Sequence, residues 1–119
     1  MKARLAVAAI VLTAITGAAS AAEAPAAFAA CKACHKVEAG ANAIGPSLFG
    51  VAGAKAGTVA AGFKYSPAMA GWGKSWDDAN LAAYLANPKD SIPGNKMVFA
   101  GVKDPAAVTA IIEYLKTLK

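Results

Sequence analysis

Eight glycines and two prolines lie within residues 39–74, and this segment limits the possible folds more than any other feature of the chain. No sustained period of 3.6 or 2 residues runs through it, so the pattern predicts neither a long helix nor a strand, only one helical turn at 67–70. A segment of this length without secondary structure is rare in a compact domain unless it wraps a ligand. We therefore expect long loops that surround a bound group.

Helices are predicted on both sides of the glycine-rich segment. Residues 23–35 are rich in alanine and contain no glycine, which favours a short helix that runs into the cysteines. Ser75 and Asp78 have the spacing of a capping box, which predicts a second helix, and Asn87-Pro88 should end it. Residues 88–103 are interpreted as a second loop, with a turn at Pro93-Gly94.

The last helix has the clearest pattern in the sequence. Asp104 is expected as its N-cap and Pro105 as a first-turn residue. Apolar residues follow at helical spacing, namely Val108, Ile111, Ile112, Leu115 and Leu118. No alternating pattern predicts a strand, so the expected fold class is all-α, with three main helices and long loops.

The first 22 residues have the pattern of an export signal. Lys2 and Arg4 precede an apolar run at 5–15, and small residues stand before the expected cleavage site. Cleavage would release one domain, residues 23–119, into the periplasm, without stable insertion in a membrane. The alternative is an uncleaved signal that anchors the protein to the membrane.

Charge and size narrow the function classes. Without Lys2 and Arg4, ten basic residues remain against seven acidic ones, a mature net charge of +3. The lysines are scattered and no arginine follows the signal, so a nucleic-acid-binding protein is not expected. The 97 mature residues include few large side chains, and a domain of this size often needs a disulfide, a metal or a cofactor to complete its core.

Both cysteines and the only histidine of the chain form the run Cys31-Lys-Ala-Cys34-His35. A disulfide between these cysteines would close a very small loop, and a thioredoxin-type dithiol needs a βαβ unit that the sequence lacks. A zinc site would need further cysteines or histidines. C-x-x-C-H is the signature of covalent haem attachment, and residues three and four apart share one face of a helix. We therefore predict thioethers from Cys31 and Cys34 to one haem c, with His35 as an iron ligand.

A second axial ligand would decide what such an iron does. The chain has no second histidine, and its mature part contains two methionines, Met69 and Met97, as soft donors. Met97 follows the Pro93-Gly94 turn on an expected loop between two helices, where a thioether can be directed at a metal. Met69 is more simply interpreted as a gap-filling apolar residue. His/Met ligation raises the reduction potential and favours electron transfer.

The sequence resembles the class I c-type cytochromes, which include mitochondrial cytochrome c and its small bacterial periplasmic counterparts. The resemblance covers nearly all of residues 23–119 and rests on motifs that occur in the family's order. These are CKACH at 31–35, GPSL at 45–48, Trp76, LAAYLANPKDSIPGNKMVFAGVKD at 81–104, and IIEYLK at 111–116.

The resemblance implies roles for further residues. Pro46 would accept a hydrogen bond from the His35 ring, and Tyr84 would direct its hydroxyl at the Met97 sulfur. Tyr65 and Trp76 would bind a haem propionate, and Phe99 would cover the distal face. Ala54 stands where mitochondrial relatives carry an arginine near the propionates. The expected docking surface for partners is a ring of lysines at the haem edge: Lys32, Lys89, Lys96 and Lys103.

The function that these features predict is that of a soluble periplasmic one-electron carrier, a monomer and not an enzyme. Its expected partners are a membrane cytochrome complex, an oxidase, a reaction centre or a periplasmic dehydrogenase. Two alternatives stay open from the sequence. One is a haem enzyme or gas sensor in which Met97 is displaced from the iron, and the other is a membrane-tethered electron-transfer subunit.

Overall fold

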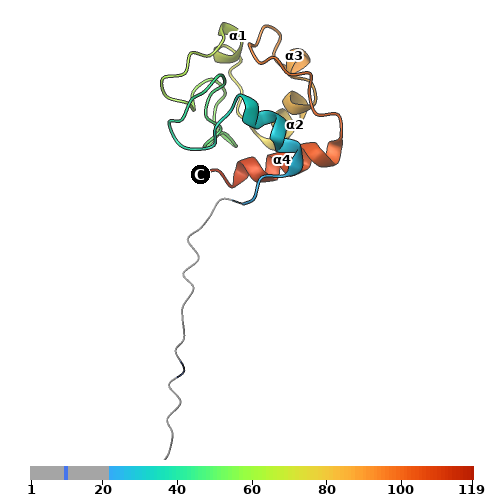
Figure 1. The fold of residues 1–119 in the computed structure, drawn as a ribbon. Coiled ribbons are helices and arrows are strands. Elements are labelled where there is room, and N and C mark those ends of the chain that lie inside the picture. The colour runs from blue at the N-terminus through green and yellow to red at the C-terminus, as the bar shows by residue number, and fades with distance from the viewer. Residues whose placement is uncertain (1–9, 11–21) are drawn as a thin grey trace, which may run out of the picture.

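The computed structural model describes residue 10 and residues 22–119. Within these residues the chain forms a 3₁₀ helix and four α-helices joined by loops (Figure 1). Their bounds are η1 (Ala26–Ala33), α1 (Pro67–Ala70), α2 (Asp78–Ala86), α3 (Pro88–Ser91) and α4 (Pro105–Lys116). The only β-type pairing in this part of the chain is an isolated bridge between Lys55 and Ser75. The predicted all-α fold is therefore confirmed.

The predicted export signal falls outside the described residues, except for positions 10 and 22. In residue 10 and residues 22–119, no helix has the length and apolar character that a membrane crossing requires.

Helix α4 forms as predicted and supplies much of the core. Its N-cap is Asp104, whose Oδ1 accepts a hydrogen bond from the Ala106 amide at 3.0 Å. The five apolar residues predicted to share one face are all buried: Val108, Ile111, Ile112, Leu115 and Leu118. Tyr114, also buried, meets Phe28 of η1 edge to face, with ring centroids 4.8 Å apart. This contact joins the first and last helices of the domain.

Helix η1 begins after Pro25, as expected, but it differs from the expected helix in its type. It is a 3₁₀ helix, in which residues three apart lie above one another. Phe28 and Cys31 therefore share one face, and both line the same cavity as Cys34, the C-cap of the helix. The tighter helix thus continues the buried face of Phe28 into the two thiols.

The predicted N-cap of α2 was wrong. Asp77, not Ser75, occupies that position, and its Oδ1 accepts from the Asn80 amide at 2.7 Å. Ser75 instead forms a bridge with Lys55, which keeps its backbone extended. The helix therefore begins later, at Asp78, and the residue before it is the cap. Asn87 ends α2 as predicted.

The interpretation of residues 88–103 as a continuous loop was also wrong, because α3 occupies Pro88–Ser91. Asn87-Pro88 both ends α2 and begins α3, since asparagine is a favoured N-cap and proline suits the first helical position. The Ser91 and Ile92 amides donate to the carbonyls of Asn87 and Pro88, and Pro88 and Ile92 are almost fully buried. This short helix anchors the loop that follows it.

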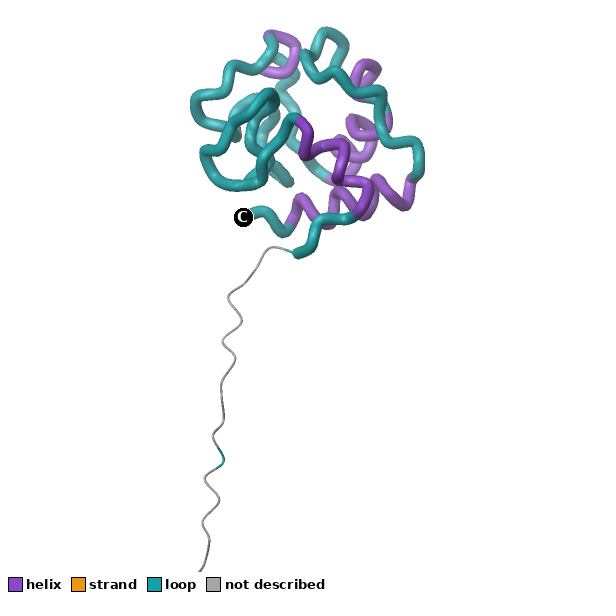
Figure 2. The backbone as a smooth tube through the Cα atoms, in the orientation of Figure 1, coloured by secondary structure: helices purple, strands orange, loops and turns teal. Residues whose placement is uncertain are grey.

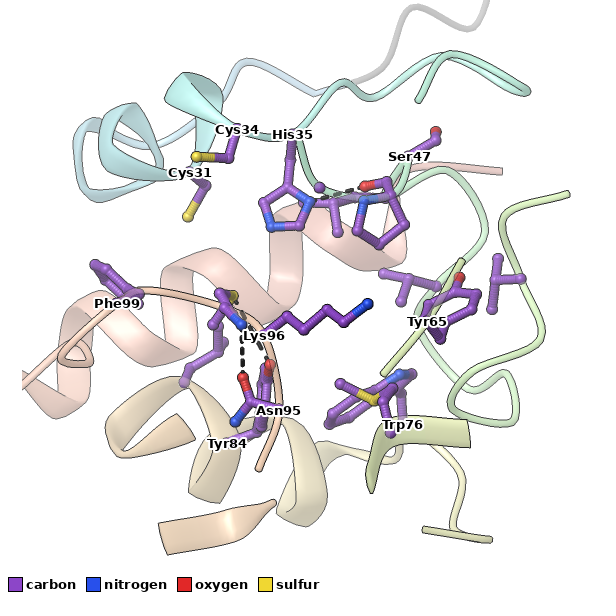
Figure 3. A pocket seen from close by; sticks show the side chains of 18 of the residues that line it. Cys31, Cys34, His35, Ser47, Tyr65, Trp76, Tyr84, Asn95, Lys96 and Phe99 are labelled. Atoms are coloured by element: carbon purple, nitrogen blue, oxygen red, sulfur yellow. Dashed lines mark hydrogen bonds between the residues drawn. The ribbon is translucent and has the colours of Figure 1, made fainter. Parts of the chain in front are cut away.

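The glycine-rich segment at 39–74 is loop apart from α1, as predicted (Figure 2). Together with η1, α2, α4 and the loop after α3, it encloses a large cavity (Figure 3). The expectation of long loops around a central space is confirmed.

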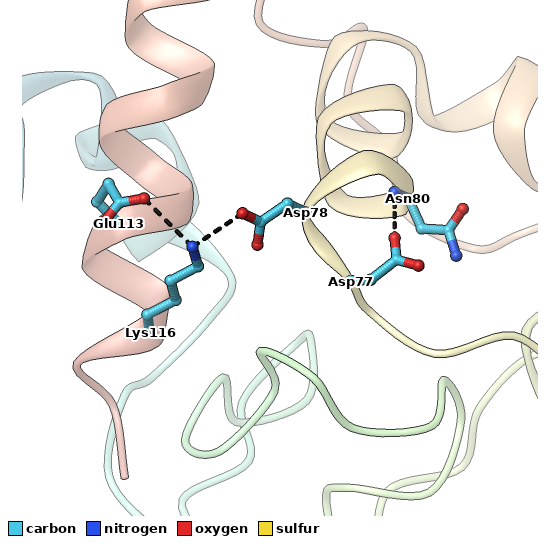
Figure 4. A network of polar contacts seen from close by, with 5 residues as sticks. All are labelled: Asp77, Asp78, Asn80, Glu113 and Lys116. Atoms are coloured by element: carbon cyan, nitrogen blue, oxygen red, sulfur yellow. Dashed lines mark hydrogen bonds and ion pairs between the residues drawn. The ribbon is translucent and has the colours of Figure 1, made fainter.

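A small polar network connects α2 and α4 at the surface (Figure 4). Lys116 Nζ lies 2.9 Å from Asp78 Oδ2 and 3.3 Å from Glu113 Oε1. The hydrogen bond to Asp78, followed by the one to Glu113, raises the pKa of Lys116. Because these side chains are exposed, the network contributes little stability, and the buried faces of the two helices hold them together.

Candidate functional site

The end of η1 and the two residues that follow it present Cys31, Cys34 and His35 to the cavity (Figure 3). The Cys31 carbonyl accepts from the amides of Cys34 at 3.2 Å and His35 at 2.9 Å, which fixes the relative positions of the three residues. Both thiols are free and half-buried. Burial raises the pKa of the Cys31 thiol.

The His35 ring is oriented by a contact with the glycine-rich segment. Its Nδ1 lies 2.8 Å from the Pro46 carbonyl oxygen. A carbonyl can only accept a hydrogen bond, so Nδ1 carries the ring proton and Nε2 keeps a free lone pair. A backbone partner that fixes the tautomer in this way is characteristic of histidines that ligate a metal.

Gly45 allows this orientation, and the sequence analysis gave it no role. A Cβ at this position would lie 2.5 Å from His35 Cε1 and 2.7 Å from Nδ1, so any larger residue would collide with the ring. The Gly45 amide donates to the Cys34 carbonyl at 2.8 Å, which brings the two segments into contact. The signal available in the sequence was the glycine directly before Pro46.

Ser47 holds the segment that follows. It is buried, its Oγ donates to the Glu38 carbonyl at 2.6 Å, and its amide donates to Asn42 Oδ1 at 3.0 Å. These bonds close the loop between His35 and Pro46, so that the Pro46 carbonyl lies against the ring. A single buried serine belongs to no periodic pattern or motif that the sequence analysis could detect. The role of Ser47 was therefore missed.

The loop after α3 forms the other side of the cavity. Figure 3 shows Asn95 and Lys96 across the cavity from Cys31, Cys34 and His35. Met97 follows, half-buried, and its Sδ receives a hydrogen bond from the Tyr84 hydroxyl at 3.8 Å. Burial raises the pKa of Tyr84 to about 12, so the hydroxyl keeps its proton and can donate throughout the physiological range.

The remaining aromatic residues of the prediction also line the cavity. Trp76 is buried and packs on Tyr84, with ring centroids 4.8 Å apart. The Tyr65 oxygen accepts from the Ala60 amide at 2.9 Å, which leaves the hydroxyl hydrogen for another acceptor. Phe99 lines the cavity beside the Met97 loop, and Met69, interpreted as a gap-filling residue, lies in the wall as well.

The four predicted docking lysines are exposed, but their environments differ. Lys96 lines the cavity, Lys32 lies next to Cys31 on η1, and Lys89 lies on α3. Lys103 is held by the fold instead, because its Nζ donates to the carbonyls of Ala86 at 2.8 Å and Ala100 at 3.1 Å. Ala86 is the last residue of α2, so this charge lies at the helix end where a cation is favourable.

The donor set and the lining fit a flat, apolar group with a metal at its centre. An imidazole nitrogen, which suits iron, and a soft thioether sulfur lie on different segments around one cavity. The cavity is lined mainly by apolar and aromatic side chains, and two thiols stand at its η1 side. Haem c, which is bound through thioethers, needs this combination of residues.

Comparisons with known proteins agree with this fit. The family model described as Cytochrome c matches residues 21–119. Cytochrome c2 iso-2 of Magnetospirillum molischianum is 62% identical over 71% of this chain and 87% of its own length. Cytochrome c of Trypanosoma brucei brucei is 48% identical over 69% of this chain and 87% of its own. Among solved structures, cytochrome cH from Methylobacterium extorquens has a TM-score of 0.73 and 54% identity, and the match covers 76% of this chain and 91% of that one.

The contact between Gly45 and the His35 ring predicts the effect of a single added methyl group. Gly45→Ala should destabilise the haem-bound protein by about 1–3 kcal/mol, since the Cβ forces the ring or the loop to move. The measurement is urea unfolding followed by circular dichroism. Gly71→Ala is the matched control, because Gly71 also has a negative φ and its added Cβ would lie 3.1 Å from the Pro67 carbonyl oxygen. Equal stability of the two variants would contradict the role assigned to Gly45.

Proposed function

The chain belongs to the class I c-type cytochromes, electron carriers with one covalently attached haem c, and we propose that it is a soluble periplasmic carrier with His/Met-ligated iron. In this proposal Cys31 and Cys34 form the thioethers, and His35 and Met97 are the axial ligands. As a member of this family the protein is not an enzyme. Its partners are redox proteins, and we propose that they include a membrane cytochrome complex, an oxidase, a reaction centre or a periplasmic dehydrogenase.

One observation carries most of the proposal. The His35 ring and the Met97 sulfur line one cavity, and each already has the hydrogen bond that a metal ligand needs on its other side. His35 Nδ1 is held by the Pro46 carbonyl, and Met97 Sδ receives the Tyr84 hydroxyl. These two bonds leave Nε2 of the histidine and a lone pair of the sulfur for the iron.

When bound, haem c supplies an iron that alternates between the ferrous and ferric states. The residues of the chain would limit the structural rearrangement that accompanies each change of oxidation state. His35 and Met97 would both hold the iron, and the apolar lining would keep water away from it, so little would have to rearrange when one electron arrives or leaves. The Tyr84 hydroxyl withdraws electron density from the Met97 sulfur and so adjusts its strength as a donor.

Tyr65 and Trp76 would hold the charged edge of the cofactor. The Tyr65 hydroxyl hydrogen and the indole N–H are the donors that a partly buried propionate requires. Ala54 supplies no charge at the position where mitochondrial relatives carry an arginine. In this chain the propionate would therefore depend more on the neutral donors Tyr65 and Trp76.

The absorption spectrum tests the ligation. The oxidised holoprotein should be low-spin and show the sulfur-to-iron charge-transfer band, and the reduced form should not bind carbon monoxide promptly. Met97→Ala should abolish the band and allow fast carbon monoxide binding, whereas Met69→Ala should keep the wild-type spectrum. A wild-type protein without the band that binds carbon monoxide promptly would instead favour the haem enzyme or gas sensor.

Exposed lysines near the cavity should steer an acidic partner. Changing Lys89 and Lys96 together to glutamate should slow reduction by a membrane oxidoreductase by roughly tenfold at low salt, and the difference should shrink at high ionic strength. Stopped-flow kinetics over a series of salt concentrations measures this. The control changes Lys55 and Lys119, two lysines outside the predicted docking set, to glutamate. Equal rates for both double variants at every salt concentration would refute the docking surface.

Cleavage of the export signal is tested by the mass of the exported protein. A polypeptide that begins near Ala22 or Glu23 and carries one haem is expected. A full-length mass would support the membrane-tethered alternative.

A further inference from the structure

The segment that carries Met97 has little regular structure of its own. It runs between α3 and α4 as a loop, with a turn at Gly94, whose φ is +86°. The Tyr84 hydroxyl contacts the Met97 sulfur at 3.8 Å, a weak bond to a side-chain tip that cannot fix the backbone. Some other contact must hold the Met97 backbone beside the cavity.

The Asn95 side chain makes that contact. Its Nδ2 donates to the carbonyls of Pro88 at 2.9 Å and Ile92 at 2.8 Å. Its Oδ1 accepts from the Met97 amide at 2.8 Å. One half-buried amide therefore joins the Met97 backbone to two carbonyls at the beginning and end of α3.

The α3 side of this connection is rigid. Pro88 is among the largest fully buried side chains, and Ile92 is 1% exposed. Only an amide side chain offers two N–H donors and a carbonyl acceptor in one planar group. Aspartate would lack the donors and serine the second donor, and the longer glutamine would shift the group by one methylene. The residue type is thus matched to the three bonds.

We propose that Asn95 is a positioning residue that holds Met97 at the haem iron by fixing its backbone to α3. This inference rests on the proposed Met97 ligation. Without the Asn95 amide the loop at 95–99 opens more often, and each opening takes the sulfur away from the iron.

The test uses the holoprotein and the variants Asn95→Ala, Asn95→Asp and Asn80→Ala. Asn80 is the control, since its Nδ2 donates to the Ser75 carbonyl at 2.8 Å and lies on α2, outside the Met97 loop. In the wild type and in Asn95→Asp, which keep an acceptor for the Met97 amide, native-state hydrogen exchange of that amide reports opening of the loop. The rate of carbon monoxide binding to the reduced protein reports departure of the sulfur, and Met97→Ala supplies the rate for a fully open site.

Asn95→Ala should speed both Met97 amide exchange and carbon monoxide binding by at least tenfold. The amides inside α4 should keep their exchange rates, which separates local opening from general loss of stability. Asn95→Asp keeps the acceptor for the Met97 amide but sets a carboxylate oxygen against the Pro88 and Ile92 carbonyls in place of the two donors, so both rates should again rise at least tenfold, and it carries the test if the alanine variant does not fold. Asn80→Ala should match the wild type.

Two results are distinguishable. If Met97→Ala binds carbon monoxide rapidly while both Asn95 variants behave like Asn80→Ala, the positioning role is overturned and the ligation stands. If the wild type binds carbon monoxide as fast as Met97→Ala, the proposed ligation is overturned, and the role of Asn95 at the iron with it.

Discussion

The structure depends on the contact between the end of η1 and the glycine-rich segment, where His35 Nδ1 donates to the Pro46 carbonyl. This bond fixes the imidazole tautomer and holds a loop with little regular structure against the first helix. Gly45 makes the approach sterically feasible, and the buried Ser47 keeps the carbonyl in place. The glycine-rich loop follows a defined path because its Pro46 carbonyl contacts one particular edge of the His35 ring.

The two sides of the cavity are built by different means. On the η1 side, a helical turn and a short, tightly bonded loop position the thiols and the imidazole. On the Met97 side, the support comes from the four-residue helix α3, anchored by the buried Pro88, and from one side-chain amide. In the proposed ligation, Met97 is therefore the iron ligand with the weaker local support, and its departure costs the protein less than that of His35.

Sequence patterns predicted the elements whose cause is local or periodic. The repeat from Val108 to Leu118 and the cap at Asp104 defined α4, and Asn87-Pro88 located the end of α2. The errors lay where tertiary contacts decide: Ser75 is drawn into a bridge with Lys55, so Asp77 becomes the cap. In the site, the residues with metal-binding chemistry could be found from their types and spacing. Gly45, Ser47 and Asn95 could not, because their roles lie in contacts between segments that no spacing encodes.

The aligned face of η1 has a consequence for how the protein is assembled. Phe28 packs on Tyr114 of α4, and the same face continues to Cys31 and Cys34 at the cavity. The face of η1 that packs on α4 is therefore continuous with the thiols at which we propose that the haem is attached. The apolar lining of the cavity becomes part of a continuous core only when the haem fills it, and a polypeptide of this size is marginal on its own burial. Maturation is in this sense a folding step: binding to the native state alone shifts the equilibrium towards it, and a thioether makes that shift permanent.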